Sequence, residues 1–462
     1  MVRIERDTMG QVEIPDEAYY GPQTVRAARN FRVSGLKLPP VFIKAQAVIK
    51  QASAKANMYA GKLDPAIGEI IIQAASEVRE GRFDDQFVVD AFQSGAGTSQ
   101  NMNANEVIAN RALEIMGEPR GRYDSIHPND HVNMSQSSND TVHTAIHIAS
   151  MEALSNRLLP VLSLLHEGLI ARSVEFRDVV KPGRTHLQDA VPVTLGQEFG
   201  GYARMVELGI KCIFTSMDGL AELNMGGTAV GTGLNAPEGF GDRAVAEVNR
   251  ITGFTFRLVH NPFEATQGAG AILATSSALR NIAVSLIKIA NDLRLLCSGP
   301  RTGIGEINLP AVQPGSSIMP GKVNPVMAEM VNMVCFQVVG NDTAIMMAAQ
   351  AGQLELNVFT PLMAHNLLGS IEILSGAVES FNRQCLSGIT ANVEHCESLA
   401  SKSLALITSL APKLGYEKAA DVAYQAYRDN RTIREVVLDS GFLVEEEADT
   451  MLDPLRMAAV KK

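Results

Sequence analysis

The stretch Ala271–Ser298, AILATSSALRNIAVSLIKIANDLRLLCS, decides the fold because it contains neither glycine nor proline. Its apolar residues recur at three- and four-residue intervals, at Ile282, Leu286, Ile289, Leu293 and Leu296. This spacing is typical of one face of an α-helix, here about 40 Å long at ~1.5 Å per residue. Gly299-Pro300 is expected to end the helix.

Comparable patterns predict four more long helices. They cover Asn139–Phe176, Thr194–Leu223, Val326–Gln350 and Pro361–Leu386. Pro160 is expected to kink the first of them. Helices that are apolar around much of their circumference need several neighbours each, and a monomeric bundle would leave part of that surface in water. We therefore expect an oligomer; the alternative is a large monomeric domain whose terminal parts cover these faces.

The segments on either side of these helices have a shorter pattern. Residues 1–50 mix brief strand-like pieces with helix, and after Gly388 short helices are separated by Gly415, Asn430 and Gly441. The sequence therefore predicts a mainly α-helical chain of three domains. These comprise residues 1–138, a central five-helix bundle over 139–387, and a small helical domain over 388–462.

The composition of the 462 residues excludes several classes of protein. Only 5% of the residues are aromatic, which suits packed helices better than sheets. The net charge of -10 disfavours binding to nucleic acid, because phosphate backbones are repelled. The five cysteines are widely spread and include no CxxC pair, so neither a disulfide framework nor a zinc knuckle is indicated.

Neither a membrane span nor a secretory signal is predicted. The apolar stretch 271–298 carries charges at Arg280, Lys288, Asp292 and Arg294, which are costly inside a bilayer. The first residues lack the apolar core of a secretory signal. We therefore expect a cytoplasmic protein that has no membrane partner.

Four polar segments interrupt the helical pattern, each at the predicted end of a long helix. They are residues 94–103, 127–140, 183–189 and 315–325, and all are rich in Ser, Thr, Asn, His or Gly. Each alone could be a helix cap or a turn. Four such segments that converge at helix ends would instead form a pocket of neutral donors and helix N-termini, which suits small carboxylates.

The fourth segment, GSSIMPGKVNP, is the most informative. Its two glycines and two prolines predict a loop that holds two serines near Lys322 and Asn324. A serine hydroxyl is a poor base unless its alkoxide is stabilised, which backbone N–H groups and a nearby ammonium can do. The glycines would also allow the loop to close over a substrate.

Rival motifs are weaker. The segments Gly95–Gly97 and Gly231–Gly233 lack the third glycine of a dinucleotide loop, and Gly321-Lys322 lacks the Ser or Thr of a phosphate loop. His143 and His147 are spaced i, i+4 and could hold a metal, although the glutamate of the HExxH motif is missing. A helix face that touches solvent or an interface is the favoured interpretation of this pair.

With these segments in view, the chain resembles the aspartase/fumarase superfamily. Residues 315–325 match its long motif, and the other three segments match its remaining blocks in order. Class II fumarases are the most similar, by Ser137-Ser138-Asn139, Gly226-Gly227-Thr228, Gly303–Glu306 and His365-Asn366. Aspartases come second, by Tyr19-Tyr20-Gly21 and by Ala96, where most fumarases have a serine that contacts substrate.

The resemblance implies the reversible hydration of fumarate to L-malate, a tricarboxylic acid cycle reaction, without a metal or organic cofactor. The alternative is an aspartate ammonia-lyase. It also implies a homotetramer whose central helices form a common core, with each active site drawing residues from three subunits.

The resemblance assigns roles to the polar residues. Ser316 would be the base, Lys322 and Asn324 would stabilise the developing charge, and His186 with Thr185 would handle the water. Glu329 would hold and polarise His186. The residues expected to orient the dicarboxylate are Thr98, Ser137, Ser138 and Asn139. The residues that match a second carboxylate site are His127, Asn129 and Asp130, although the usual preceding basic residue is not evident in Asp124-Ser125-Ile126.

Overall fold

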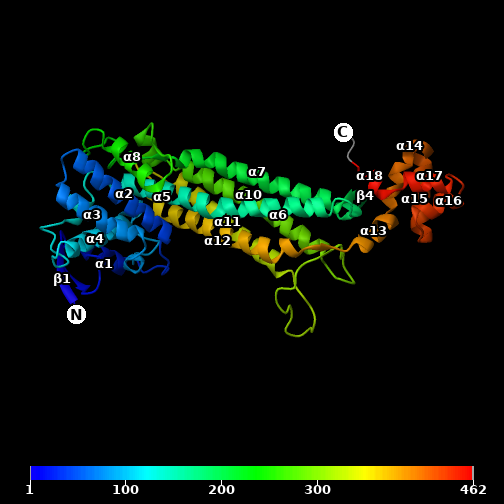
Figure 1. The fold of residues 1–462 in the computed structure, drawn as a ribbon, viewed down its shortest axis with the longest axis horizontal. Coiled ribbons are helices and arrows are strands. Elements are labelled where there is room, and N and C mark those ends of the chain that lie inside the picture. Colours follow the sequence, from blue (N-terminus) through cyan, green and yellow to red (C-terminus); the bar gives the residue numbers. More distant parts are fainter. Residues whose placement is uncertain (1, 460–462) are drawn as a thin grey trace. The chain divides into compact units, whose positions relative to one another are not determined.

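A computed structural model describes residues 2–459 and is mostly helical, as predicted (Figure 1). All of its sheets have two strands. The chain forms two compact units, each built from three separate stretches of sequence. Unit 1 contains the stretch up to Pro160, Lys211–Asn281 and Phe336–Ser375, and unit 2 contains Val161–Ile210, Ile282–Cys335 and the stretch from Gly376 onward. The boundaries of the three domains expected from the sequence stay a prediction.

The long helices lie where their apolar spacing places them. They are α5 (Ser138–Ala153), α6 (Leu159–Glu175), α7 (Leu195–Leu220), α10 (Gly270–Leu296), α11 (Val326–Gln350) and α12 (Thr360–Gln384). Both ends of α11 agree with the prediction, because Pro325 precedes its first residue and glycine follows soon after its last.

The expected break near Pro160 is a π-helical turn. This turn, η4 (Leu154–Leu158), separates α5 from α6 in the residues just before the proline. Proline has no N–H to donate, and its ring collides with the carbonyl group four residues earlier. A locally widened turn accommodates both effects.

Unit 1 begins with a hairpin of β1 (Val2–Asp7) and β2 (Gly10–Pro15). Besides α5 and parts of other long helices, it contains α1 (Pro22–Asn30), α2 (Pro40–Tyr59), α3 (Pro65–Arg79), α4 (Thr98–Ile115), α8 (Phe240–Thr252) and α9 (Pro262–Gln267). Its main core joins α2, α3 and α4 through buried side chains such as Ala47, Ile71 and Val107. This core holds α4, whose first turn belongs to one of the polar segments.

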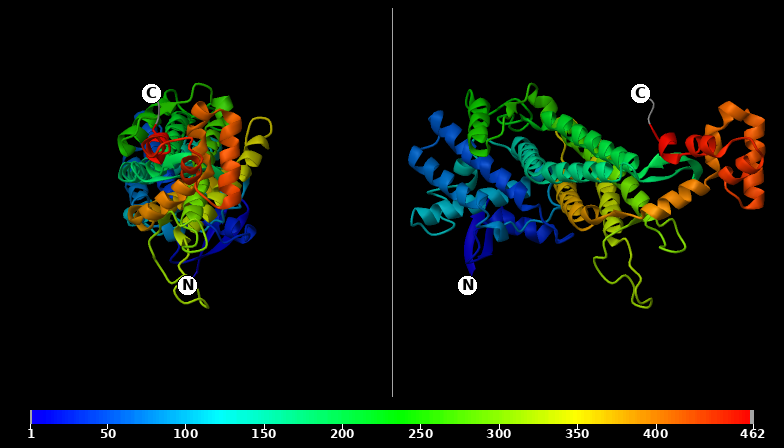
Figure 2. Two further views of the ribbon diagram at one scale, coloured as in Figure 1. Left: turned by 90° about the vertical axis from the view of Figure 1, so that its right-hand side faces the viewer. Right: turned by 45° about the vertical axis from the view of Figure 1, so that its right-hand side comes forward.

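Unit 2 contains the hairpin of β3 (Val180–Thr185) and β4 (Gln188–Thr194) together with parts of the long helices. Tyr202 Oη donates to Asp292 Oδ2 at 2.8 Å, which ties α7 to α10. The chain between α10 and α11 extends away from these helices as long loops (Figure 2).

The last part of unit 2 is a group of short helices. They are α13 (Val393–Lys402), α14 (Ala411–Leu414), α15 (Tyr416–Asp429), α16 (Ile433–Asp439), α17 (Glu445–Met451) and α18 (Pro454–Met457). Gly415, Asn430 and Gly441 all have positive φ and lie between these helices, as the sequence predicted. A separate apolar core, with Leu410 and Val436 fully buried, holds the group together.

Within residues 2–459, α10 is the one helix long and apolar enough to cross a membrane by length and composition. The core helix of a soluble protein passes the same test. Its charged residues are paired with other protein groups: Arg280 Nη1 lies 2.7 Å from Asp342 Oδ2, and Lys288 pairs with Asp292. These pairs agree with the expectation that the helix does not span a bilayer.

Candidate active site

The first two polar segments meet at the N-termini of α4 and α5. Thr98 is the first residue of α4, and its Oγ1 lies 3.1 Å from Ser138 Oγ, at the first residue of α5. Ala96 and Gly97, just before α4, both have positive φ, so the chain turns sharply into the helix. Two hydroxyls at paired helix N-termini form an arrangement that attracts anions.

The cap of α5 does not use the side chains of Ser138 and Asn139, two of the predicted substrate residues. Ser137 Oγ accepts from the Asn139 N–H at 3.2 Å, and Asp140 Oδ1 accepts from the Ser137 N–H at 3.0 Å. Ser137 and Asp140 therefore cap the helix themselves. Ser138 instead bonds Thr98, and Asn139 Nδ2 donates to Ala229 O at 2.8 Å.

A buried lysine that the sequence reasoning missed joins these segments. Lys50 on α2 is 1% exposed, and its Nζ lies 2.9 Å from three amide oxygens. They belong to Asn101, Asn133 and Gln136. Burial lowers the pKa of Lys50 to about 7, although the Asp140 carboxylate acts in the opposite direction. The one sequence signal for this buried site was a lysine within the apolar stretch of α2. The amide groups that it contacts cannot be identified from the sequence.

Replacing Lys50 by Met is expected to lower the free energy of unfolding by about 3 kcal/mol, because three amide oxygens, one of them on the buried Asn101, lose a charged donor. Urea unfolding of the purified protein measures this loss. Lys55→Met is the matched control on the same helix, since Lys55 bonds Glu69 at 3.0 Å in an exposed pair and should change stability by less than about 1 kcal/mol. Equal stability of the two variants would contradict the assigned role.

Asp140 connects α5 to the glycine-rich segment 226–235. Its Oδ2 accepts from the Thr228 N–H at 2.9 Å, and the residue is fully buried. Burial raises the pKa of Asp140 to about 6, while bonds from backbone N–H groups oppose this shift. Because Thr228 has a positive φ of 54°, the carboxylate holds a strained turn beside Asn139.

In unit 2, the loop 315–325 is braced from within. Gly315 N donates to Lys322 O at 2.9 Å, and Asn324 Nδ2 donates back to Gly315 O at 2.6 Å. Lys322 Nζ donates to Asn324 Oδ1 at 2.6 Å. These bonds bring Lys322 and Asn324 together at the base of the loop.

The same loop surrounds the hydroxyl of Ser316 with backbone donors. Ser316 Oγ accepts from the N–H groups of Ile318 at 3.3 Å and Met319 at 2.9 Å. Two N–H groups that face one oxygen stabilise negative charge on it. This is the feature that a serine needs in order to act as a base.

The third polar segment is the one whose setting was predicted wrongly. Thr185 ends β3, and His186 and Leu187 form the turn to β4, with φ of 54° and 60°. A two-residue hairpin turn with both φ values positive matches the twist of the flanking strands. The segment therefore lies on a β-hairpin, whereas we expected the end of a long helix.

A buried carboxylate holds this hairpin. Glu306 is fully buried, and its carboxylate oxygens lie 2.8 Å from Arg184 Nη1 and 3.2 Å from Lys181 Nζ. These contacts are close enough for ion pairs, although neither has hydrogen-bond geometry. Lys181 also lies 3.1 Å from Glu198. Removal of one member of such a group would leave an unpaired buried charge close to His186.

Glu329 lies in the first turn of α11, where a carboxylate is favoured by the helix dipole. Among the described residues of unit 2, no hydrogen bond or ion pair joins Glu329 or the loop 315–325 to His186. The predicted contact between Glu329 and His186 therefore stays a prediction, and in an oligomer it can form between copies.

The residues of the second carboxylate site lie together in unit 1. His127 Nδ1 accepts from the N–H groups of Asn129 at 3.1 Å and Asp130 at 3.2 Å, and so caps a short π-helical turn. A cavity of about 360 Å³ is lined by His127, Asn129 and Arg6. The sequence analysis found no basic residue next to this block, but β1 brings Arg6 to it. The binding role of this site stays a prediction.

Comparisons with known proteins support the resemblance to the aspartase/fumarase superfamily. Residues 10–340 match the family described as Lyase, and residues 406–459 match the family described as Fumarase C C-terminus. An aspartate ammonia-lyase from a Bacillus species is 49% identical over 99% of this chain and 97% of its own length. A class II fumarate hydratase from Brucella suis is also 49% identical, over 99% of both chains.

A solved structure shows the same fold. It is described as fumarate lyase:delta crystallin from Brucella melitensis bound to cobalt, and it covers 100% of both chains with a TM-score of 0.97 and 48% identity. With the helical fold and the four polar segments, these matches define the class of protein. The chain belongs to this lyase family, the aspartase/fumarase superfamily, and it is a lyase.

Proposed function

We propose that this lyase is a fumarate hydratase, which interconverts L-malate and fumarate by removing a carbon-bound proton next to a carboxylate and releasing water. The observation that carries the proposal is the pair of backbone N–H groups held on Ser316 Oγ. The motif Ser137-Ser138-Asn139 favours a fumarase over an aspartase, as the resemblance implies.

In the malate direction, Ser316 as the alkoxide takes the proton from the carbon next to a carboxylate. That proton is weakly acidic, and the carboxylate gains further negative charge as the proton leaves. The Lys322 ammonium and the Asn324 amide, which are joined by a hydrogen bond on the same loop, stabilise this charge in the proposed mechanism. Donors that are already oriented toward developing charge lower the barrier without reorganisation.

The hydroxyl that leaves the neighbouring carbon needs a proton. His186 supplies it, and in the reverse direction activates the water, with Thr185 beside it on the hairpin. Thr98, Ser138 and Asn139 hold the dicarboxylate at the N-termini of α4 and α5. In this mechanism, residues of different copies of the chain meet at one site.

We infer an oligomer from the apolar surface of the long helices, and the resemblance to the superfamily implies that it is a homotetramer. Large apolar side chains are exposed on α7, α10 and α11 in the single chain, namely Leu208, Phe214, Val284, Leu295, Met333, Phe336, Met346 and Met347. An exposed apolar surface on a soluble protein marks an interface. Packing against other copies would bury these side chains and bring the polar segments of different chains together.

Phe336→Glu is expected to disrupt assembly and to abolish turnover, although Phe336 belongs to none of the polar segments. The side chain is 57% exposed in the single chain. A glutamate there should therefore leave the fold of the chain intact and disrupt only a contact with another copy. Analytical ultracentrifugation and the malate assay measure the two effects. Tyr59→Glu, at a 69% exposed tyrosine, is the control and should stay assembled. An assembled, active Phe336→Glu protein would contradict the proposed packing.

Aspartate ammonia-lyase is the second candidate, because the Bacillus relative with that name is as similar as the fumarate hydratase from Brucella suis. Ala96 also favours it. This residue is 3% exposed and has a positive φ of 56°, and its methyl group cannot donate the hydrogen bond of a substrate-contacting serine.

One assay separates the two functions. The purified protein is given L-malate and L-aspartate separately, and fumarate formation is followed by its absorbance. We expect fumarate from L-malate and no ammonia from L-aspartate. Turnover of L-aspartate without turnover of L-malate would overturn the proposed function in favour of the second candidate.

A further inference from the structure

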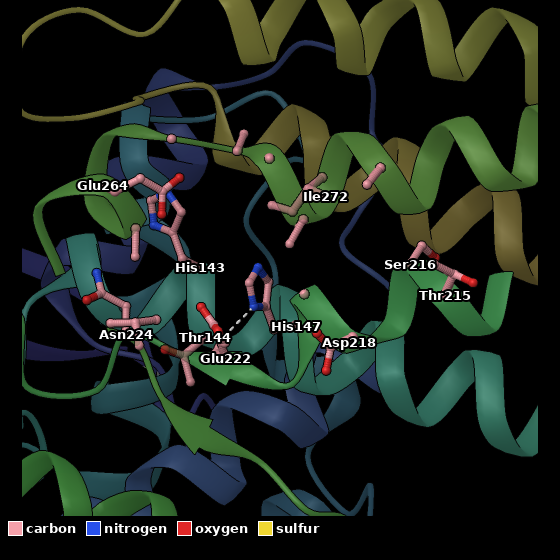
Figure 3. A pocket seen from close by; sticks show the side chains of 18 residues that line it. His143, Thr144, His147, Thr215, Ser216, Asp218, Glu222, Asn224, Glu264 and Ile272 are labelled. Atoms are coloured by element: carbon pink, nitrogen blue, oxygen red, sulfur yellow. Dashed lines mark hydrogen bonds between the residues drawn. The ribbon is translucent and has the colours of Figure 1, made fainter. Parts of the chain in front are cut away.

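A second cavity lies in unit 1, and none of the residues used in the proposed mechanism lines it. It has a volume of about 350 Å³ and is lined by α5, the end of α7, α9 and the start of α10. Figure 3 shows its polar side chains, among them His143, His147, Asn224 and Glu264. Pockets for small organic ligands start at roughly this volume.

The two histidines of the i, i+4 pair present only acceptor atoms to this cavity. His143 Nδ1 lies 3.0 Å from Asn139 O, and His147 Nδ1 lies 2.7 Å from Glu222 O. A carbonyl oxygen can only accept, so both Nδ1 atoms carry the proton and both Nε2 atoms keep a lone pair. Burial lowers the pKa of His143 to about 4 and also lowers the pKa of His147, so both rings are neutral at pH 7.

The hydroxyl groups around them have used their donors as well, and Asn224 uses one of its two amide N–H groups. Three hydroxyls each donate to a backbone carbonyl of their own helix at 2.8–2.9 Å, those of Thr144, Thr215 and Ser216. Asn224 Nδ2 donates to Thr266 Oγ1 at 2.9 Å. Apart from the second N–H of the Asn224 amide, for which no partner is found within the described residues, the side chains that line the cavity offer only lone pairs.

Two of these acceptors are buried without a partner. His143 is 4% exposed and Asn224 is 3% exposed, yet His143 Nε2 and Asn224 Oδ1 accept no hydrogen bond within the described residues. A buried acceptor left unpaired destabilises the fold. Two such acceptors on the wall of one cavity indicate that a donor from outside the chain forms the missing hydrogen bonds.

The carboxylates at the cavity add negative charge. Asp218 and Glu222 both pair with Arg257, whose Nη1 lies 3.1 Å from Asp218 Oδ1 and whose Nη2 lies 3.1 Å from Glu222 Oε1. For the exposed carboxylate of Glu264, no ion pair or side-chain hydrogen bond is found within residues 2–459. An incoming cation therefore meets one uncompensated carboxylate next to several neutral acceptors.

We propose that this cavity binds a small organic ammonium ion, whose N–H groups donate to the imidazole Nε2 atoms and to Asn224 Oδ1 and whose charge is met by Glu264. The described residues contain no group of three His, Cys, Asp or Glu side chains that could hold a metal ion. The volume also exceeds what a bare ion needs. This proposal does not rest on the proposed function.

Isothermal titration calorimetry of the full-length protein with 1,4-diaminobutane tests the proposal. We expect one diamine per chain, and no binding of 1,4-butanediol, which has the same length and no charge. Glu264→Gln and His147→Leu should each weaken diamine binding by roughly tenfold or more, the loss of one charge-assisted hydrogen bond. Glu247→Gln is the control for non-specific attraction, since it removes one negative charge from an exposed ion pair with Arg250, and should leave the affinity unchanged.

The exposed position of Glu264 keeps the test decisive if His147→Leu fails to fold. Diamine binding that is equal in Glu264→Gln, Glu247→Gln and the unchanged protein would overturn the proposal, because the attraction would then be non-specific. Absence of diamine binding would overturn it too. Binding of one Zn²⁺ per chain in place of the diamine would assign the cavity to a metal and would equally refute the proposal.

Discussion

Ser316→Ala is expected to lower kcat by roughly 10²–10⁴-fold, the usual contribution of a positioned base, while the protein stays folded and assembled. Ser316 Oγ is the atom on which the N–H groups of Ile318 and Met319 converge. Removal of this oxygen removes the only atom of that side chain able to take the proton from carbon. KM should change little, because binding of the dicarboxylate is assigned to other residues.

Steady-state kinetics with L-malate measure this effect. Ser317→Ala is the matched control, since this adjacent serine is exposed on the same loop and has no role in the proposed mechanism. We expect Ser317→Ala to keep most of the activity. Comparable activity in the two variants would remove Ser316 from the mechanism.

The second large effect is expected at Lys322. Lys322→Met should lower kcat by roughly 10²–10³-fold, as loss of one oriented donor to a developing oxyanion does. The ammonium is held 2.6 Å from Asn324 Oδ1 at the base of the loop. Its charge is needed most when the carboxylate gains electron density, so the effect on kcat should exceed the effect on KM.

Two further variants define this role. Lys322→Arg keeps the charge but presents a planar fork of donors, so it should restore only part of the activity. Lys413→Met removes an exposed lysine that pairs with Glu447 and should leave kcat unchanged. If Lys322→Met raised KM and left kcat unchanged, Lys322 would bind the substrate without stabilising the transition state.

The long helices could be predicted from the sequence because their signals are local. Apolar spacing marked the buried face of α10, and Pro325 and Gly299-Pro300 marked helix ends. Pro160 likewise produced a break in the turn before it. These features depend on neighbours within one or two turns, which a single sequence displays.

The setting of His186 could not be predicted in the same way. Its hairpin contains Pro182 and Pro192, which disfavour strands, and its turn uses His and Leu at positive φ in place of Asn-Gly. The ion pairs to Glu306, more than a hundred residues away in sequence, hold the hairpin. Tertiary contacts override weak local preferences here.

The connections between the polar segments also lay beyond sequence reasoning. Lys50 bonds Gln136, and Arg6 lines the same cavity as His127, although each pair is far apart along the chain. The pair His143 and His147 was assigned to a solvent-facing or interface-facing surface, and this is wrong for His143, which is buried within the chain. Periodicity gives the face of a helix but does not identify its neighbours.

The central claim is that one active site contains residues of several copies of the chain. Coexpression of two inactive variants, Asn139→Ala and Ser316→Ala, tests it most directly through the malate activity of the purified mixed oligomers. If the two residues of each site come from different subunits, random mixing restores an intact site in roughly a quarter of the positions. Activity near that fraction is the predicted result. Mixed oligomers as inactive as each variant alone would contradict the account, because both residues would then come from the same chain.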